Sequence, residues 1–240
     1  MKLTQLILLA TIALCSCTGY VVEHNVVYYK QWNEAVGSFR TKLPADAESF
    51  ETLGRGYACD KAHVFRVGSI VDGADPKTFD IIDDAYATDK FRAYYYGTAI
   101  ELSRPENFER IDGYYSTDRH DVFYTSKALH VCDAKKFRFV FKEDTDDNYQ
   151  RWATDGCFYY LSEFKIPSDD YTNVRIFKNS AGFAKDKRWV YFLNHRINQN
   201  QDGKHILDTV DVATFEVTDY VECRDKFGCI NVFHGREDCK

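Results

Sequence analysis

The chain has 240 residues, of which 45% are apolar and 28% charged, which is the composition of a globular protein and not of a disordered one. A formal net charge of -6 argues against electrostatic binding of nucleic acid. After the N-terminus, no apolar run approaches the roughly 18 residues of a membrane span, which excludes a polytopic membrane protein.

The N-terminus has the pattern of an export signal. Lys2 supplies a short positive region, and the nine residues 6–14 form an apolar region too short to span a bilayer. We therefore expect residues 1–16 to be a signal peptide and residues 17–240 to form a single β-repeat domain.

The end of this signal resembles a bacterial lipobox. Leu14 stands three residues before Cys17, and the small residue Ser16 directly precedes it. The resemblance predicts lipid attachment at Cys17, with an ordinary signal peptidase site as the alternative. Thr18 follows in place of Asp, which by resemblance to Gram-negative lipoproteins predicts an exported protein anchored to the cell envelope at the outer membrane.

An aspartate recurs along the rest of the chain at regular intervals. Successive copies are 29, 29, 37 and 31 residues apart, the longest interval containing the acidic insert 143–148, and Asp225 belongs to a degenerate sixth copy; the five clear copies are at Asp60, Asp89, Asp118, Asp155 and Asp186. Such self-similarity predicts a tandem repeat over about residues 21–235.

Three further positions repeat with the same phase. The residue three before the aspartate is always aromatic: Tyr57, Tyr86, Tyr115, Trp152 and Phe183. The residue five after it is also aromatic: Phe65, Tyr94, Phe123, Tyr160 and Tyr191. The residue eleven after it is aliphatic: Val71, Ile100, Leu129, Ile166 and Ile197. We expect the two aromatic series to face one shared core, which explains the 16% aromatic content.

Each repeat reads as a β-hairpin. Aromatic and β-branched arms flank a polar turn at the aspartate, and Gly68 and Gly97 suit a turn at the end of the second arm. Asp75-Pro76 then begins a type I turn or a single helical turn.

These units predict an all-β fold. We expect five to six hairpin units of about 29 residues, with atypical terminal units at about residues 21–55 and 216–240. An open, curved, solenoid-like stack is favoured over a closed β-propeller-like ring, because a four-stranded propeller blade usually takes about 40–45 residues.

The core motif resembles the DKNYY family of bacterial repeat proteins. The resemblance rests on Tyr-Ala-Thr-Asp-Lys at 86–90, Tyr-Tyr-Tyr-Gly at 94–97 and Asp-Pro-Lys-Thr-Phe at 75–79. No copy reads DKNYY literally, and Gly follows Asp155. The family has no established activity, so the resemblance implies a fold and a bacterial origin but no catalytic residue.

The polar residues do not form a recognisable active site. We expect the five repeated aspartates to cap their own turns, with a ladder of metal ligands as the alternative. The segment 144–148 lacks the glycine and distal glutamate of an EF-hand loop, which favours a solvated insert. No catalytic residue, metal or cofactor is expected.

Six cysteines remain once Cys15 is removed with the signal and Cys17 carries lipid. An even number in an exported chain favours disulfides, with zinc binding and buried free thiols as alternatives. If all six pair, an odd number of bonds must join the first three to the last three: Cys59, Cys132, Cys157, Cys223, Cys229 and Cys239.

The sequence therefore predicts a non-catalytic envelope lipoprotein that contacts the membrane through its lipid and presents a binding face to an unknown protein or polysaccharide partner. A soluble periplasmic or secreted small-ligand-binding module is the alternative. An enzyme is the third hypothesis, favoured if the inserts near 143–150 and 198–208 meet around His195, His205 or Asp147. Surface tyrosines could stack on sugars, although core packing explains most tyrosines.

Overall fold

The computed structural model describes residues 18–141, 151–199 and 202–239. Over these ranges the protein is all-β, built of small antiparallel sheets of which none closes into a barrel. Helix is limited there to three short 3-10 turns: η1 (Pro105–Asn107), η2 (Ala134–Lys136) and η3 (Tyr171–Asn173). Within the same ranges, no helix has the length and apolar character needed to cross a membrane.

The chain divides into two compact units, Met1–Asp84 and Ala85–Lys240. The boundary falls within the repeat series, so it does not separate two kinds of fold. That residues 17–240 form one domain stays a prediction.

The first unit begins with an atypical sheet of three strands in chain order: β1 (Gly19–Glu23), β2 (Val26–Asn33) and β3 (Gly37–Lys42). A four-stranded sheet follows, again in chain order: β4 (Glu51–Gly54), β5 (Tyr57–Cys59), β6 (Val64–Arg66) and β7 (Ser69–Ile70). The short strand β8 (Asp80–Ile81) ends this unit.

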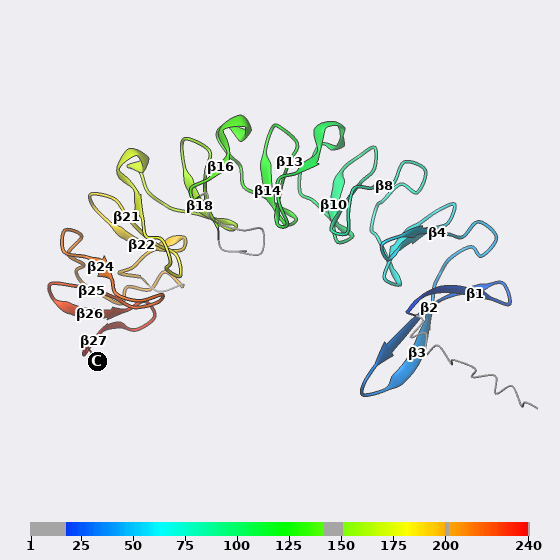
Figure 1. The fold of residues 1–240 in the computed structure, drawn as a ribbon, viewed down its shortest axis with the longest axis horizontal. Coiled ribbons are helices and arrows are strands. Elements are labelled where there is room, and N and C mark those ends of the chain that lie inside the picture. The colour runs from blue at the N-terminus through cyan, green and yellow to red at the C-terminus, as the bar shows by residue number, and fades with distance from the viewer. Residues whose placement is uncertain (1–17, 142–150, 200–201, 240) are drawn as a thin grey trace, which may run out of the picture. The chain divides into compact units, whose positions relative to one another are not determined.

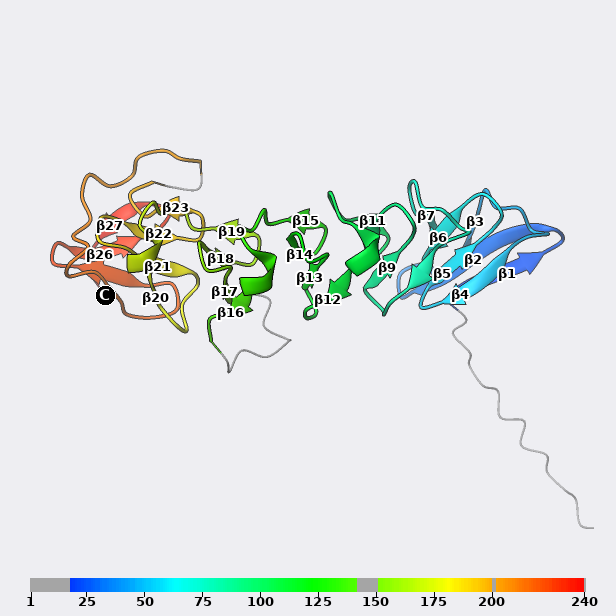
Figure 2. The same cartoon turned by 90° about the horizontal axis from the view of Figure 1, so that it is seen from above.

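The second unit starts with β9 (Tyr86–Thr88), β10 (Ala93–Tyr95) and β11 (Thr98–Ala99), which pair in that order. Four four-stranded sheets follow, and Figures 1 and 2 show them one after another along the chain. Their strands are β12 (Glu109–Arg110), β13 (Tyr115–Thr117), β14 (Val122–Tyr124) and β15 (Lys127–Ala128); β16 (Arg138–Phe139), β17 (Trp152–Thr154), β18 (Tyr159–Leu161) and β19 (Phe164–Lys165); β20 (Arg175–Ile176), β21 (Phe183–Lys185), β22 (Val190–Phe192) and β23 (His195–Arg196); and β24 (Glu216–Val217), β25 (Cys223–Asp225), β26 (Gly228–Asn231) and β27 (Gly235–Glu237).

The repeat is a four-stranded meander, which corrects the predicted hairpin. The two arms seen in the sequence are the inner strands, such as β13 and β14, and a two-residue strand pairs with the outer edge of each. Outer strands this short leave room for four strands in about 29 residues. The expectation that such a repeat is too short for four strands is therefore wrong.

The glycines predicted to end the second arm lie in tight turns. Gly68 has φ 80° and Gly97 has φ 79°, and the residues before them, Val67 and Tyr96, also have positive φ. Two consecutive residues with positive φ between paired strands are characteristic of a type I′ turn. A Cβ added to Gly68 would lie 2.8 Å from the Cβ of Tyr29, so glycine is required there for space as well as for conformation.

The positions that recur in every copy of the repeat lie in the core. Each residue three before, five after and eleven after the five aspartates is at most 7% exposed, which confirms that core packing explains the aromatic excess. The predicted single shared core is wrong, however. Tyr115 pairs with Tyr124 and Ser116 with Phe123, and because side chains alternate along a strand, Tyr115 and Phe123 lie on opposite faces of one sheet.

The core of the second unit is instead a series of layers between successive sheets. Tyr86 of one repeat and Phe123 of the next share one layer, with Phe108 between them at ring distances of 5.8 and 6.2 Å. Tyr115 of that next repeat packs in the following layer with Tyr160. Both of these layers thus join the aromatic residue before one aspartate to the aromatic residue after the next.

Candidate functional site

The five repeated aspartates occupy equivalent turns. In each copy one carboxylate oxygen accepts hydrogen bonds from the backbone N–H groups two and three residues later, at 2.6 to 3.0 Å. All five are buried: Asp60, Asp89, Asp118, Asp155 and Asp186. These bonds form an Asx turn, the local motif for which short polar side chains are favoured between strands.

The second carboxylate oxygen ties the turn to the connection that precedes it. The backbone N–H of Asp46 donates to Asp60 at 2.8 Å, and that of Arg104 donates to Asp118 at 3.0 Å. Burial alone would raise the pKa of Asp60. The hydrogen bonds that its carboxylate accepts from backbone N–H groups outweigh the effect of burial, so the pKa is lowered. With three or four donors each, the carboxylates act as anchors of the fold.

A tyrosine hydroxyl adds a further donor in three copies. Tyr94 donates to Asp89 at 2.7 Å, Tyr160 to Asp155 at 2.9 Å and Tyr191 to Asp186 at 2.5 Å. Phenylalanine stands at the same position after Asp60 and Asp118. The choice between tyrosine and phenylalanine five residues after the aspartate is therefore a sequence signal for this bond, in addition to the aromatic packing that both residues provide.

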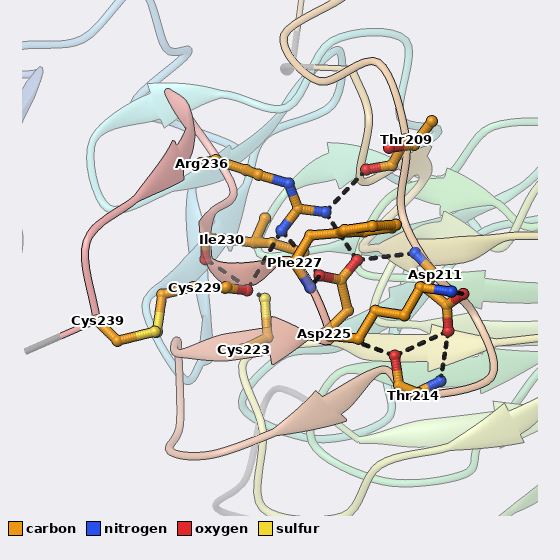
Figure 3. A network of polar contacts seen from close by, with 12 residues as sticks. Thr209, Asp211, Thr214, Cys223, Asp225, Phe227, Cys229, Ile230, Arg236 and Cys239 are labelled. Carbon is orange, nitrogen blue, oxygen red and sulfur yellow. Dashed lines mark hydrogen bonds and ion pairs between the residues drawn. A yellow bond between two sulfur atoms is a disulfide. The ribbon is translucent and has the colours of Figure 1, made fainter.

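The degenerate sixth copy keeps the turn with different partners, which Figure 3 shows. Asp225 accepts from the N–H groups of Phe227 and Asp211, each at 2.8 Å, and the Arg236 guanidinium pairs with both of its carboxylate oxygens. Arg236 also donates to the Thr209 carbonyl at 3.0 Å. Arg236 therefore fixes the last turn at the position where the other repeats carry an aliphatic residue.

Four of the six candidate cysteines form disulfides. Cys132 bonds to Cys157 and Cys229 to Cys239, so neither bond joins the first three of the six cysteines to the last three. Cys17, the predicted site of lipid attachment, lies outside the described residues. Cys132 and Cys157 also lie beside Asp155, the only group in the described ranges with the spacing for a metal, but their sulfur atoms are bonded to each other.

For Cys59 and Cys223 the disulfide prediction is wrong. Both are buried free thiols, and burial raises the pKa of Cys59 to about 11 and that of Cys223 to about 12. Cys223 stands two residues before Asp225, at the position that is alanine or serine in the other copies, and it packs in the last layer with Ile230. It acts there as a small apolar side chain.

The enzyme hypothesis requires the inserts near 143–150 and 198–208 to meet, and the structure describes only part of these two segments. Residues 142–150, with Asp147, lie outside the described residues. His195 belongs to β23, where burial lowers its pKa, and His205 forms an isolated bridge with Gln199. A cavity of about 210 Å³ lies near the second insert, lined in part by Trp189, Asn198 and Asp208. It is smaller than a typical ligand pocket of about 300–1,000 Å³.

A group of four tyrosines in the second unit lies at the margin of the core layers. We call Tyr95, Tyr96, Tyr114 and Tyr124 the tyrosine surface. They come from the ends of the inner strands and the adjoining turns of two neighbouring sheets, and Tyr96 is 48% exposed while the others are half-buried. The rings of Tyr95 and Tyr96 are 4.8 Å apart, and those of Tyr114 and Tyr124 stack at 5.9 Å.

The tyrosine surface is uncharged and firmly supported. Burial raises the pKa of Tyr95 to about 12, and the nearby hydroxyls of Tyr96, Tyr114 and Tyr124 add to the rise. Beneath it, the ring of Tyr124 packs edge-on against the buried Tyr115 at 5.0 Å. The surface is not predicted by the repeat pattern, because Tyr95 and Tyr114 stand at positions that are not aromatic in every copy.

Comparisons with known proteins identify the repeat. The sequence model of the DKNYY family matches residues 20–163, which is more than half of the chain. No curated protein and no solved structure matches it. Beyond the matched range, sheets with the same aspartate turn continue to Asp225.

Proposed function

The chain belongs to the DKNYY family, and from that premise we propose that it is a non-catalytic lipoprotein, exported and anchored to the cell envelope through Cys17, whose repeat array binds envelope polysaccharide on the tyrosine surface. The observation that carries the proposal is the gathering of Tyr95, Tyr96, Tyr114 and Tyr124 at one surface, whereas tyrosines at the recurring core positions, such as Tyr86 and Tyr115, are buried in layers.

Tyrosine suits a polyhydroxylated ligand for a physical reason. Its ring face packs against the apolar C–H face of a sugar, and its hydroxyl exchanges hydrogen bonds with the sugar hydroxyls. Two ion pairs lie beside the surface, Lys127 with Glu163 at 2.5 Å and the buried pair of Arg151 with Asp112. The four side chains of the surface are themselves uncharged, which favours an uncharged stretch of glycan over a charged protein partner.

Substitution of the tyrosine surface tests this function. Tyr96→Ala combined with Tyr114→Ala should weaken binding to the polysaccharide fraction of the bacterium's own envelope at least about tenfold, because each change removes one ring from the stacking face. Affinity electrophoresis measures the change. Tyr220→Ala is the matched control, since Tyr220 is 50% exposed in the same unit but lies outside the surface.

Two outcomes would count against polysaccharide binding. Unchanged affinity in the double variant would show that the tyrosine surface is not the site. The second outcome has two parts. The unaltered protein binds no glycan fraction, and a purified envelope protein binds the unaltered protein but not the Tyr96→Ala variant. That result would indicate a protein partner in place of the polysaccharide.

Lipid attachment is tested at the mature N-terminus. Mass spectrometry should find an acylated Cys17 as the first residue, and Cys17→Ala should move the protein from the membrane fraction to the soluble fraction, because several acyl chains hold a protein far more firmly than one. Cys15→Ala, which places a usual residue inside the lipobox, should leave attachment intact. An unmodified N-terminus downstream of residue 17 would refute the anchor.

We also propose that the repeats form an open, curved, solenoid-like stack. The terminal sheet supports this proposal. Three residues before the aspartate, where the other repeats have a buried aromatic residue, the last copy has the exposed Glu222. The Cys229–Cys239 disulfide links β26 to the residues that follow β27 in the same sheet. A polar terminal unit is what an open repeat array needs. Small-angle X-ray scattering should give the elongated distance distribution of a stack, and a ring-like profile would overturn it.

A further inference from the structure

The first unit carries a hairpin whose end is apolar on both faces. We call residues 32–39, which join β2 to β3, the hairpin tip. Trp32 is 56% exposed, Val36 72% and Phe39 37%. Trp32 pairs with Ser38 and Gln31 with Phe39, so Trp32 and Phe39 lie on opposite faces. A partner lying against one face would leave the other exposed, whereas end-on insertion would cover all three side chains.

The chain enters the same sheet beside this tip. Strand β1 runs antiparallel to β2, and its first residue, Gly19, pairs with Lys30, two residues before Trp32. Cys17 precedes Gly19 by two residues, which span at most about 7 Å when fully extended. A lipid on Cys17 would therefore hold this end of the sheet, with its apolar tip, against the bilayer.

The polar groups of the tip suit shallow insertion. The Asn33 side-chain oxygen accepts from the N–H groups of Ala35 at 3.1 Å and Val36 at 2.8 Å, so these turn donors are satisfied internally. Glu34 is the sole acidic residue between Trp32 and Phe39, and its carboxylate limits the depth to the headgroup region. Behind the tip, Lys30 and Arg40 are both paired with Glu23.

We propose that the hairpin tip inserts into the headgroup region of the membrane that carries the anchor, as a second contact beside the lipid; the proposal rests on lipid attachment at Cys17. Tryptophan is enriched at this level of a bilayer because its ring is apolar and its N–H is polar. The second contact would fix the orientation of the first sheet relative to the membrane, which a flexible lipid tether alone does not do.

Fluorescence quenching in vesicles tests the insertion. The lipidated mature protein is reconstituted into phosphatidylcholine vesicles whose acyl chains are brominated near the headgroup. Trp32 is one of three tryptophans, and Trp152 is buried, so we expect partial quenching of the emission. Trp32→Phe should abolish the quenching and Trp189→Phe should leave it unchanged. Val36→Asp should reduce the quenching while Trp32 is still present, because it places a charge in the inserted tip.

The outcomes separate the tip from the anchor. Protein that floats with the vesicles but shows no Trp32-dependent quenching overturns the insertion and leaves the anchor standing. If the mature N-terminus proves unmodified, the anchor fails, and the same quenching is measured on the protein mixed with excess vesicles. Quenching that depends on Trp32 then supports the tip by itself, and its absence overturns it.

Discussion

Replacing Phe123 by alanine should lower the free energy of unfolding by about 3–5 kcal/mol, the usual cost of removing a buried aromatic ring. Phe123 has no exposed surface and closes the layer that contains Tyr86, Ile100 and Phe108. Its removal leaves a cavity between two sheets, and strands this short cannot shift far enough to fill it. Urea unfolding followed by tyrosine fluorescence and far-UV circular dichroism measures the loss.

Phe123→Tyr is the informative control. Three other repeats carry tyrosine at this position and direct its hydroxyl to the turn aspartate. We expect the variant to keep its stability because the new hydroxyl can reach Asp118. Phe108→Ala should cost less than Phe123→Ala, since Phe108 is only partly buried. Equal losses for Phe123→Ala and Phe108→Ala would contradict the layered packing.

Replacing Asp155 by alanine should cost at least about 3 kcal/mol, because it leaves several buried donors without an acceptor. The carboxylate accepts from the N–H groups of Cys132, Cys157 and Phe158 at 2.7 to 2.8 Å and from the Tyr160 hydroxyl at 2.9 Å. Asp155→Asn should cost less, since its amide oxygen still accepts the two bonds of the Asx turn. Urea unfolding of both variants gives the comparison, and a loss below about 1 kcal/mol for Asp155→Ala would refute the anchoring role.

The same carboxylates predict how stability changes with pH. Burial raises the pKa of Asp155, Asp186 and Asp225, but the hydrogen bonds that these carboxylates accept outweigh burial, and the net shift of each pKa is downward. A folded pKa below the unfolded value of about 3.9 stabilises the fold above that pH, and the stabilisation is lost as pH falls through the folded pKa. Stability should thus fall steeply below about pH 4, and Asp155→Asn should reduce the slope.

Much of this fold could be predicted from the sequence because its repeats are in phase. Core residues precede and follow each aspartate at fixed distances, and their burial confirms that the recurring positions lie in the core. The faces could not be assigned as easily. Tyr115 and Phe123 are eight residues apart with a turn between them, and only the register of that turn decides that they face opposite layers.

The candidate sites were harder to predict because they depend on departures from the repeat. Tyr95 and Tyr114 occupy positions that are not aromatic in every copy, so periodicity gave them no weight. The pairing of Cys132 with Cys157 depends on how the connection before η2 approaches the Asp155 turn, where the N–H groups of both cysteines reach the same carboxylate. The spacing of the cysteines in the sequence does not predict that these two lie close together.

The layered core has a consequence for how such a protein changes length. In the second unit a layer is completed by the aromatic residue before one aspartate and the aromatic residue after the next, so neighbouring repeats there present the same pair of complementary faces. Duplicating or deleting the stretch from one aspartate to the next, as between Asp89 and Asp118, rejoins faces that already fit. Stability in such arrays is a sum over nearest neighbours, so selection can lengthen or shorten the array by whole repeats without redesigning any core.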